Sequence, residues 1–559
     1  MLRKAVCMTP SAVFTVGVVI PGVMGVALLL LIVPVTCLEF PVYRMQQYTL
    51  QGQPHGSQSS LVQAESRTLE AELLTRRCII MRLKDFTMEK WGQILSQPAG
   101  AVLILVPLDL PSVLPSSEQN FMEQEFDLLT NKTLLPIYFA LEETEVLAIY
   151  EETKAASLTL RSSSALEVLF GMVMGSGFQM ITGETQSKPV INSAIVTLEG
   201  HLTGRGNVGD LLTVVIVAHY DSFGAAPWLA YGADSNGSGV AVLMEMIRLF
   251  HLLYKSSRSK PRYNLLFALT GGGKFNYQGS KHWIEEHLDH SETSILHENV
   301  AFVLCLDTLA SGNTLYLHVS KPPPEGSAQW EFVQELQSVI GSPLFFGVNF
   351  SLIHKKINLG DSLLAWEHEQ FSLRRVPSFT ISHLDSHKRG LKNTILDTRS
   401  QVDIKTLTRN TRILSQALAM FMYKETIKET RDKLDIFQGE LEVQAPRLTS
   451  IIDWLVSQPR ATQLIGKSHP LLSTMEQLFR RHLSDVRRHV FKADNRHPEI
   501  IFYDQLKQTM TSYRVKPAVF DLFVAVIVAV YLCVIHHSIQ NFGRLYYGIV
   551  RLIGKQKKK

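Results

Sequence analysis

The sequence predicts an α/β fold with a mixed, mainly parallel sheet sandwiched between helices. Residues 212–218 (LTVVIVA) are apolar without interruption, as expected for a strand that is covered on both faces. Strand-like and helix-like segments then alternate from residue 196 to about residue 425. Such alternation is the pattern of parallel strands joined by crossover helices. We therefore expect one large domain at 196–425.

The other elements of this domain follow from their local patterns. Short apolar runs predict strands at 264–269, 300–306, 314–319 and 378–382. Apolar residues at helical spacing predict helices at 240–254, 281–287, 329–339 and 406–426.

The chain on either side of this domain has a different pattern. Residues 42–195 contain short apolar runs separated by Glu-rich, helix-favouring segments, which predicts a smaller N-terminal α/β domain. Residues 426–515 lose such runs, and between 471 and 486 apolar residues recur at helical spacing. Four arginines lie elsewhere on this predicted helix: Arg480, Arg481, Arg487 and Arg488. We expect a helical region packed on the main domain, with a lipid-binding helix as the alternative.

Composition limits the classes of function. The chain has 559 residues, 46% of them apolar, so it is too apolar to be disordered and long enough for about two to four domains. Lys and Arg number 55 against 51 Asp and Glu, and this small excess does not favour a nucleic-acid partner. Five cysteines exclude a disulfide-built scaffold. Cys78 and Cys305 lie in apolar, strand-like runs, where we expect buried free thiols.

Both ends of the chain carry a long apolar run. Residues 5–38 are uncharged and follow Arg3 and Lys4, which predicts a secretory signal at 1–38 or, alternatively, an uncleaved anchor. Residues 518–535 contain one charge, Asp521, and predict a transmembrane helix, with a buried core helix as the alternative. The tail 536–559 carries six Lys or Arg and no acidic residue. That asymmetry predicts a cytoplasmic tail and a lumenal main domain.

Three further features bear on the compartment. Residues 555–559 read K-x-K-x-x, the pattern of a signal for retrieval to the endoplasmic reticulum. N-x-S/T sequons predict glycosylation at Asn131, Asn236 and Asn349. Asp521 is either an interfacial residue or an intramembrane contact for a partner helix.

The strongest local motif follows the strand predicted at 212–218. His219 and Asp221 are two residues apart directly after it, and ligands in open α/β sheets gather at the carboxyl ends of strands. From these residues alone, a metal ligand with its supporting carboxylate and a structural His–Asp pair are equally good interpretations. A Gly-rich segment at 232–239 (GADSNGSG) follows and leads into a predicted helix.

In the order, spacing and flanking strands of these motifs, residues 196–425 resemble the di-zinc aminopeptidase-like superfamily. Its active members include aminopeptidases, glutamate carboxypeptidases and glutaminyl cyclases. They use H-x-D, a bridging Asp, a Glu pair, a further Asp and a final His. A two-metal site needs such a set, because each zinc takes about four ligands and a carboxylate bridges the metals.

The resemblance implies that this chain keeps only part of the ligand set. The positions that match are His219, Asp221 and Asp307. The positions that depart are Ser235 for the bridging Asp, Gly273 and Lys274 for the Glu pair, and Asn393 for the final His. Nearby substitutes are Asp234, His383 and His387, which would have to supply three roles at once.

The departures argue against catalysis. Without the first Glu, no general base takes the proton from a zinc-bound water. Lys274 puts a cation where a dication would lie, which disfavours metal binding. We therefore expect a pseudoenzyme with no catalytic residue, no metal and no cofactor. The alternatives are a zinc aminopeptidase-like hydrolase with an atypical site and a lumenal peptide-binding receptor.

Nearly the whole chain resembles the nicalin family, a nicastrin-related branch of that superfamily. The likeness rests on residues 43–48 (YRMQQY), 271–279 (GGGKFNYQG), 365–369 (AWEHE) and 513–521 (YRVKPAVFD). It implies a non-catalytic, single-pass scaffold of the endoplasmic reticulum membrane. It also implies assembly with the nodal modulator protein and a small multi-pass membrane protein, in a complex that associates with the translocon and supports multi-pass membrane protein biogenesis.

Overall fold

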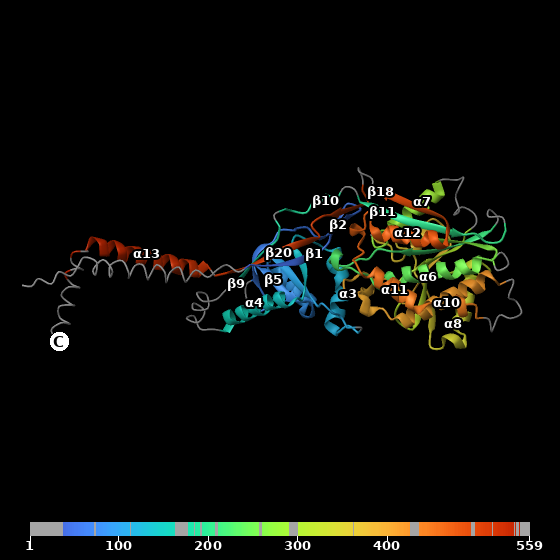
Figure 1. Cartoon of the computed structure of the whole chain (residues 1–559), viewed down its shortest axis with the longest axis horizontal. Coiled ribbons are helices and arrows are strands. Elements are labelled where there is room, and N and C mark those ends of the chain that lie inside the picture. Colours follow the sequence, from blue (N-terminus) through green and yellow to red (C-terminus); the bar gives the residue numbers. More distant parts are fainter. Residues whose placement is uncertain are drawn as a thin grey trace, which may run out of the picture.

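In the described part of the computed structural model, a large folded body lies at one end and the long helix α13 lies at the other (Figure 1). The structure describes residues 37–541, 543 and 547, except for 72–73, 112, 163–176, 184, 191–192, 207–210, 257–259, 290–299, 362, 425–434, 493–497 and 517. Of the signal or anchor predicted at 1–38, residues 1–36 lie outside the described part of the chain. Nearly all of the tail beyond residue 541 also lies outside them.

The larger domain is built on an eight-stranded sheet with the order β16-β15-β17-β14-β12-β13-β11-β18. Strands β17, β14, β12 and β13 are parallel neighbours at its centre. Antiparallel pairs flank them, β15 with β17 on one side and β11 with β13 and β18 on the other. The predicted mixed, mainly parallel sheet is therefore confirmed. Its strands are β11 (Ala194–Leu202), β12 (Leu212–His219), β13 (Tyr263–Thr270), β14 (Val300–Leu306), β15 (Thr314–Val319), β16 (Asn349–His354), β17 (Ser378–Ser382) and β18 (Ser484–Lys492).

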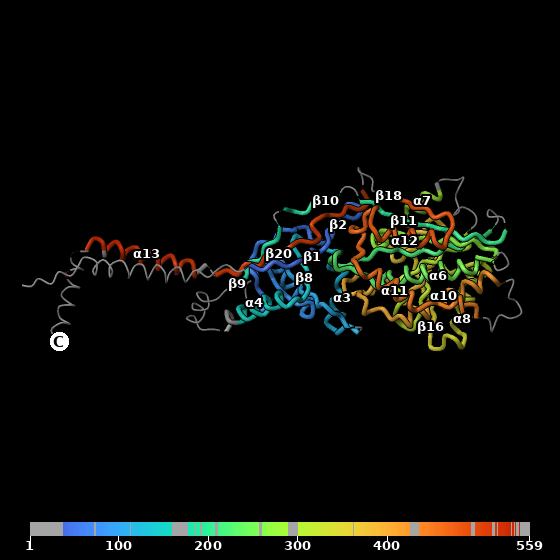
Figure 2. The backbone as a smooth tube through the Cα atoms, viewed as in Figure 1, coloured from blue at the N-terminus to red at the C-terminus, as the bar shows by residue number. Residues whose placement is uncertain are grey.

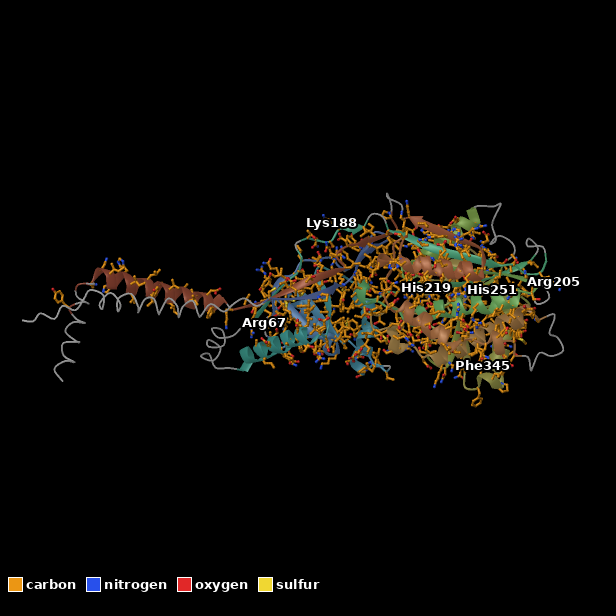
Figure 3. All side chains as sticks on the ribbon, in the orientation of Figure 1. Arg67, Lys188, Arg205, His219, His251 and Phe345 are labelled. Atoms are coloured by element: carbon orange, nitrogen blue, oxygen red, sulfur yellow. The ribbon has the colours of Figure 1, made fainter. Side chains whose placement is uncertain are left out.

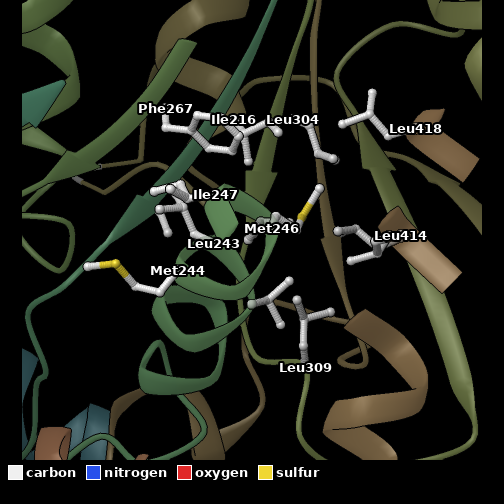
Figure 4. Packing of buried hydrophobic residues seen from close by; sticks show 14 of the residues in the cluster. Ile216, Leu243, Met244, Met246, Ile247, Phe267, Leu304, Leu309, Leu414 and Leu418 are labelled. Atoms are coloured by element: carbon white, nitrogen blue, oxygen red, sulfur yellow. The ribbon is translucent and has the colours of Figure 1, made fainter. Parts of the chain in front are cut away.

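Helices cover both faces of this sheet. Successive side chains of a strand point to opposite faces, so Val214 and Ile216 of β12 join one hydrophobic cluster and Val215 and Val217 join another. Figure 4 shows the first cluster, with side chains of α6 and α10 gathered against Ile216 and its neighbours. The helices on this face are α6 (Gly237–Tyr254), α8 (Ala328–Ile340), α10 (Ile404–Met422), α11 (Ala445–Leu455) and α12 (Pro470–His482). Those on the other face are α7 (Gln278–Asp289) and α9 (His368–Leu373).

The smaller domain is a closed barrel with the strand order β1-β20-β9-β4-β5-β6-β8. Strand β20 comes from the far end of the chain and pairs antiparallel with β1, in a register that runs from Cys37↔Tyr513 to Tyr43↔Lys507. The barrel strands are β1 (Cys37–Arg44), β4 (Gln63–Arg67), β5 (Cys78–Arg82), β6 (Ala101–Val106), β8 (Ile137–Leu141), β9 (Gly177–Ile181) and β20 (Lys507–Val515). Its helices are α2 (Met88–Ser96), α3 (Ser116–Thr130) and α4 (Thr144–Ser162).

A third sheet, with the order β10-β19-β2-β3-β7, adds to the junction of the two domains. In Figure 2 the labels of β2 and β10 lie between the barrel and the eight-stranded sheet. Its strands are β2 (Gln47–Leu50), β3 (Gln53–Ser57), β7 (Lys132–Thr133), β10 (Pro189–Val190) and β19 (Ile500–Tyr503).

The helical prediction for 426–515 is correct for α11 and α12 and wrong from Ser484 onward. Helix α12 ends at His482, and β18, β19 and β20 follow it. Leu483 and Val486, expected on one helix, instead lie against Gly200 of β11. These three strands form by pairing with β11, β2 and β1. Because strand formation depends on such distant partners, the local pattern did not reveal it.

Helix α13 (Ala518–Gln540) is long and apolar enough to cross a membrane, and none of its segment Phe520–His537 is buried in the structure. The other described helix that meets this test is α6, which is mostly buried in the core. Strand β20 ends at Val515, so the barrel leads almost directly into α13. Asp521, near the start of α13, is exposed.

The two cysteines expected to be buried free thiols are confirmed. Cys78 lies in β5 of the barrel and Cys305 in β14 of the eight-stranded sheet, and both are buried and unbridged. Burial raises the pKa of the Cys78 thiol to about 12 and that of Cys305 well above its ordinary value. Both thiols therefore stay protonated at neutral pH.

Candidate functional site

The polar site lies at the carboxyl ends of the central parallel strands, inside the larger domain, where Figure 3 labels His219. His219 ends β12, and Asp307 directly follows β14. Gly273 and Lys274 belong to the loop after β13. Parallel strands bring such ends to one edge of a sheet, so residues from separate parts of the sequence meet here.

His219 and Asp221 do not pair with each other but with different parts of the site. Nδ1 of the buried His219 lies 3.3 Å from Oε2 of Glu367, which is itself buried. The Asp221 carboxylate accepts hydrogen bonds from the N–H of Gly273 at 2.9 Å and from the hydroxyl of Thr462 at 2.5 Å. Asp221 therefore holds the loop after β13, and Glu367 orients the histidine.

Lys274 reaches into the centre of the site. Its Nζ donates to Oγ of Ser235 at 2.7 Å and to the carbonyl of Lys392 at 2.8 Å. Only 8% of the residue is exposed. Burial lowers the pKa of Lys274, and the neighbouring carboxylates of Asp307 and Asp221 oppose that shift. The Lys274 cation thus lies beside Ser235, the residue that the sequence aligns with the bridging Asp.

A second lysine, Lys392, completes the centre. Its Nζ lies 3.5 Å from Oδ2 of Asp307, donates to the carbonyl of Ala365 at 2.6 Å and lies 3.8 Å from the ring centroid of Trp366. Burial lowers the pKa of Lys392 to about 8, and Asp307 opposes the shift. Burial disfavours the charge of Asp307, but Lys392 and Lys274 hold the pKa of that carboxyl well below its usual range.

Of the three residues considered as substitutes, Asp234 and His383 are engaged by other groups, and His387 lines the neighbouring cavity. Asp234 accepts hydrogen bonds from the N–H of Ala310 at 2.8 Å and the hydroxyl of Ser311 at 2.9 Å. His383 lies 2.9 Å from the same hydroxyl. Asp397 accepts from the N–H of Asp234 and of Ser235, and burial together with the Asp234 charge raises the pKa of Asp397 to about 7. These groups fix the 232–239 loop.

The residues present do not fit a di-zinc centre. In the part of the chain that the structure describes, no group of three or more His, Cys, Asp or Glu side chains is placed to hold a metal ion. The first position of the Glu pair leaves no room, since a Cβ at Gly273 would lie 2.3 Å from Cγ of His219. Lys274 and Lys392 supply two positive charges next to Asp307.

A cavity of about 690 Å³ opens beside the two lysines. Lys274, Lys392 and Asn393 line it from the larger domain, and Glu123 and Asp127 of α3 line it from the smaller domain. The cavity therefore lies at the junction of the two domains and gives access to the site.

Glu125 of α3 joins the two domains next to this cavity. Its buried carboxylate accepts hydrogen bonds from the N–H of Ala225 at 2.5 Å, the hydroxyl of Thr394 at 2.5 Å and the N–H of Ile395 at 3.1 Å. Burial raises the pKa of Glu125 to about 7, and these hydrogen bonds oppose the shift. One carboxyl group thus fastens α3 to the loop that carries Lys392 and Asn393.

The three sequons differ in accessibility. Asn131 directly follows α3 and Asn349 begins β16, and both are exposed. Asn236 is fully buried, and its Nδ2 donates to the carbonyl of His219. A glycan cannot occupy that position in the folded chain, so the prediction for Asn236 is wrong.

Sequence reasoning missed Lys392, Glu367 and Glu125. Lys392 directly precedes Asn393, so the family pattern pointed to the correct loop but to the neighbouring residue. Asn393 lines the cavity, whereas Lys392 is the residue within reach of Asp307. Glu367 lies in the AWEHE segment that carried part of the resemblance. Glu125 follows no motif, because its partners lie in another domain.

Fold and site define a protein of the aminopeptidase-like class. Residues 199–417 match the family model described as Peptidase family M28. The crystal structure of the gamma-secretase component nicastrin has the same fold, with a TM-score of 0.58 and 11% identity over 85% of this chain and 99% of that chain.

Two relatives then give the family. BOS complex subunit NCLN of Homo sapiens is 52% identical over 519 residues, which are 93% of this chain and 92% of that protein. Nicalin of Caenorhabditis elegans is 28% identical over 536 residues, 92% of each chain. The chain belongs to the nicalin family, and the resemblance seen in the sequence is confirmed.

Proposed function

We propose that this protein is a non-catalytic scaffold of the endoplasmic reticulum membrane, anchored by α13, with its ectodomain in the lumen and its basic tail in the cytoplasm. Its partners are the nodal modulator protein and a small multi-pass membrane protein. The complex associates with the translocon and supports the biogenesis of multi-pass membrane proteins. The BOS complex subunits among the relatives support membership of such a complex, and α13 supports the anchor.

The observation that carries the non-catalytic part is the pair of lysines in the site. Nζ of Lys392 lies 3.5 Å from Oδ2 of Asp307, and Lys274 is held beside Ser235. A dication about 4 Å from one ammonium group would be repelled by about 8 kcal/mol at an effective dielectric constant near 20. Lys392 and Lys274 therefore stabilise the buried carboxylate of Asp307, and their positive charges oppose the binding of a metal ion there.

Purification of the full chain in a mild detergent tests the scaffold. We expect the nodal modulator protein and a small multi-pass membrane protein to copurify in fixed ratio with the tagged chain. Recovery of the tagged chain alone as a monomer would contradict the proposal.

Asp521 sharpens this test. If its carboxylate contacts a partner helix within the membrane, Asp521→Ala should reduce recovery of the multi-pass partner. Leu522→Ala is the matched control, since Leu522 is the neighbouring exposed residue of α13. Equal recovery from both variants would make Asp521 an interfacial residue.

Metal analysis separates the scaffold from an atypical hydrolase. We expect less than one zinc per purified full-length chain and no peptidase activity that chelation removes. About two zinc ions per chain, lost with activity on chelation, would overturn the proposal, because a di-metal site requires them.

The cavity of about 690 Å³ favours one alternative, a receptor for peptides. Such a receptor would bind free peptides saturably, and Lys392→Met would weaken that binding because Lys392 lines the cavity. The scaffold predicts no saturable binding of free peptides to the full chain.

The proposed compartment is tested by the glycosylation of the chain and by the effect of substitutions in its C-terminal tail. Endoglycosidase H should shift the mobility of the wild-type chain, and Asn131→Gln and Asn349→Gln should each remove part of that shift, because these two sequons are exposed. Replacing Lys555 and Lys557 by Ala should release part of the protein from the endoplasmic reticulum. Sensitivity of the tail to protease added outside intact vesicles checks the orientation.

A further inference from the structure

A second cavity, of about 310 Å³, lies between the C-terminal ends of α6 and α12. On one side the cavity is bordered by His251 of α6 and by Lys255, which directly follows α6. On the other side it is bordered by Arg481 and His482 of α12. Lys260 contributes a third cation. Among the described residues that line this cavity none is acidic.

Among the described residues, no carboxylate pairs with any of the three cations, so their charges are available to a ligand. Within the described part of the chain, Lys255, Lys260 and Arg481 have no ion-pair partner at 4.0 Å or less, whereas the neighbouring Arg480 pairs with Glu476 at 2.8 Å. Cations near helix C-termini offset the partial charge of the last carbonyls, which accounts for Lys255 after α6 and Arg481 on α12 but not for Lys260. It does not explain why they surround a cavity.

His482 supplies the second observation. Both of its ring nitrogens are buried and lack a hydrogen-bond partner among the described residues. Nδ1 of His251 lies 2.7 Å from the carbonyl of His482, so the pair is packed together at the cavity wall. A buried polar atom without a partner is costly. An acceptor in the cavity would satisfy the N–H of the His482 ring.

The electrostatic surroundings of His482 agree with this geometry. Burial lowers the pKa of His482 to about 4, and His251, Arg447, Arg481 and Arg248 lower it further. Arg248 and Arg447 both pair with Glu245. His482 is therefore neutral at neutral pH, with one N–H to donate in a region of positive potential.

We propose that this cavity binds the phosphate or sulfate group of a small soluble molecule. Arg481 supplies a planar pair of N–H donors, Lys260 and Lys255 supply ammonium groups, and His482 supplies a neutral donor, which together are the donors that an oxyanion accepts from. The volume lies at the lower end of the range of small-molecule sites. It suits a group of that size with a short organic substituent.

The position of the cavity identifies the source of the anion. Figure 3 labels His251 towards the end of the ectodomain that lies opposite α13. A lipid headgroup at the membrane surface is therefore remote from the cavity. The ligand comes from solution.

Calorimetric titration of the full-length protein in a non-ionic detergent tests the site with three probes: inorganic phosphate, inorganic sulfate and glucose 6-phosphate. We expect saturable binding of at least one probe. Arg481→Gln and Lys260→Gln should each weaken it about tenfold, because each removes a charge-assisted contact. Arg480→Gln is the matched control and should leave the affinity unchanged, since Arg480 is already paired with Glu476.

A spectroscopic measurement keeps the test independent of affinity. The bound anion should raise the pKa of His482, seen as a shift of its ring resonances in the wild type and not in Arg481→Gln. The proposal is overturned if no probe binds saturably or if Arg480→Gln and Arg481→Gln weaken binding equally. It is also overturned if vesicles containing a phosphoinositide bind to the wild type but no soluble probe does.

Discussion

The barrel and the eight-stranded sheet are assembled from different parts of the chain. The central strands of the eight-stranded sheet all come from residues 212–382 and pair in parallel. The barrel starts at Cys37 and is closed by β20, which ends at Val515 just before α13. The barrel therefore depends on the last strand that precedes α13, whereas the core of the larger domain does not.

The two regions also differ in what their interiors contain. Around β20 the barrel buries apolar side chains such as Val42, Ile80 and Met510. The larger domain also has an apolar core, but at the ends of its central strands it buries in addition a charged network around Lys392, Lys274 and Asp307. Hydrophobic burial tolerates small changes of geometry, but a buried ion pair requires both partners. A substitution in the barrel should therefore lower stability mainly through lost hydrophobic burial. A substitution in the charged network should lower it mainly by leaving a buried charge without its partner.

The largest effect is expected from a charge in the barrel. Met510 of β20 is fully buried, so Met510→Asp should cost roughly 4–5 kcal/mol and open the barrel. Thr509→Asp is the matched control on the exposed side of the same strand. Limited proteolysis of the full chain measures the effect, with new cleavage expected in the barrel. Equal resistance of the two variants would show that β20 is not needed to close it.

The charged network is tested by removing one partner and then both. Lys392→Met leaves Asp307 buried without its nearest cation and should cost about 3 kcal/mol. The double variant Lys392→Met with Asp307→Asn should recover most of that loss. Thermal unfolding of the full chain measures both. A double variant as unstable as the single one would mean that Lys392 stabilises by packing on Trp366 instead.

The junction between the two regions should depend on pH. Glu125 has a pKa of about 7 in the folded chain, against 4.5 for an ordinary Glu. The folded chain holds this proton more tightly, so the stabilisation is complete below the unfolded pKa and is lost as the pH rises through about 7. Relative to Glu125→Gln, the stability of the wild type should fall by about 3 kcal/mol over that interval.

The measurement is thermal unfolding of wild type and variant across the pH range. Asp127→Asn, on the exposed side of the same helix, is the control and should show no such difference. A pH-independent gap between the wild type and Glu125→Gln would contradict the assignment.

The smallest changes in stability are expected from replacing one glycine in each domain by alanine. A Cβ at Gly273 would lie 2.3 Å from Cγ of His219, so Gly273→Ala should cost about 1–3 kcal/mol. Gly92 lies within α2 with nothing within 4 Å of a Cβ, so Gly92→Ala should stabilise by about 0.5–1 kcal/mol. Both changes are read from the shift in thermal unfolding. Stabilisation by Gly273→Ala would mean that His219 can move away without loss.

Five strands of the larger domain, β12, β13, β14, β15 and β17, and the location of its site could be predicted because their apolar patterns are local. Strands β11 and β16 of the same sheet were not predicted. The continuous apolar run before His219 required a strand covered on both faces, and the structure contains it. The three C-terminal strands could not be predicted, since residues such as Val486 and Met510 show their role only beside β11 and β1.

In the site too, some residues could be predicted from the local sequence and others only from the packed structure. Gly273, Lys274 and Ser235 departed from the family pattern in the sequence itself, and in the structure Lys274 and Ser235 contact each other. The position of Asn393 was one residue from Lys392, which contacts Asp307. A sequence pattern places a loop at a site, but the backbone geometry of that loop decides which side chain enters it.

The sequence by itself determined the α/β class, the apolar segment that became α13 and the chemical identity of the groups at the positions aligned with the family's metal ligands. These depend on residue type and short-range periodicity, which the chain carries along its length. The tertiary structure decided that β20 closes the barrel, that Lys392 neutralises Asp307, that Glu125 fastens the domains and that Asn236 is buried. Each of these depends on partners distant in sequence, because pairing, burial and desolvation are properties of the packed molecule.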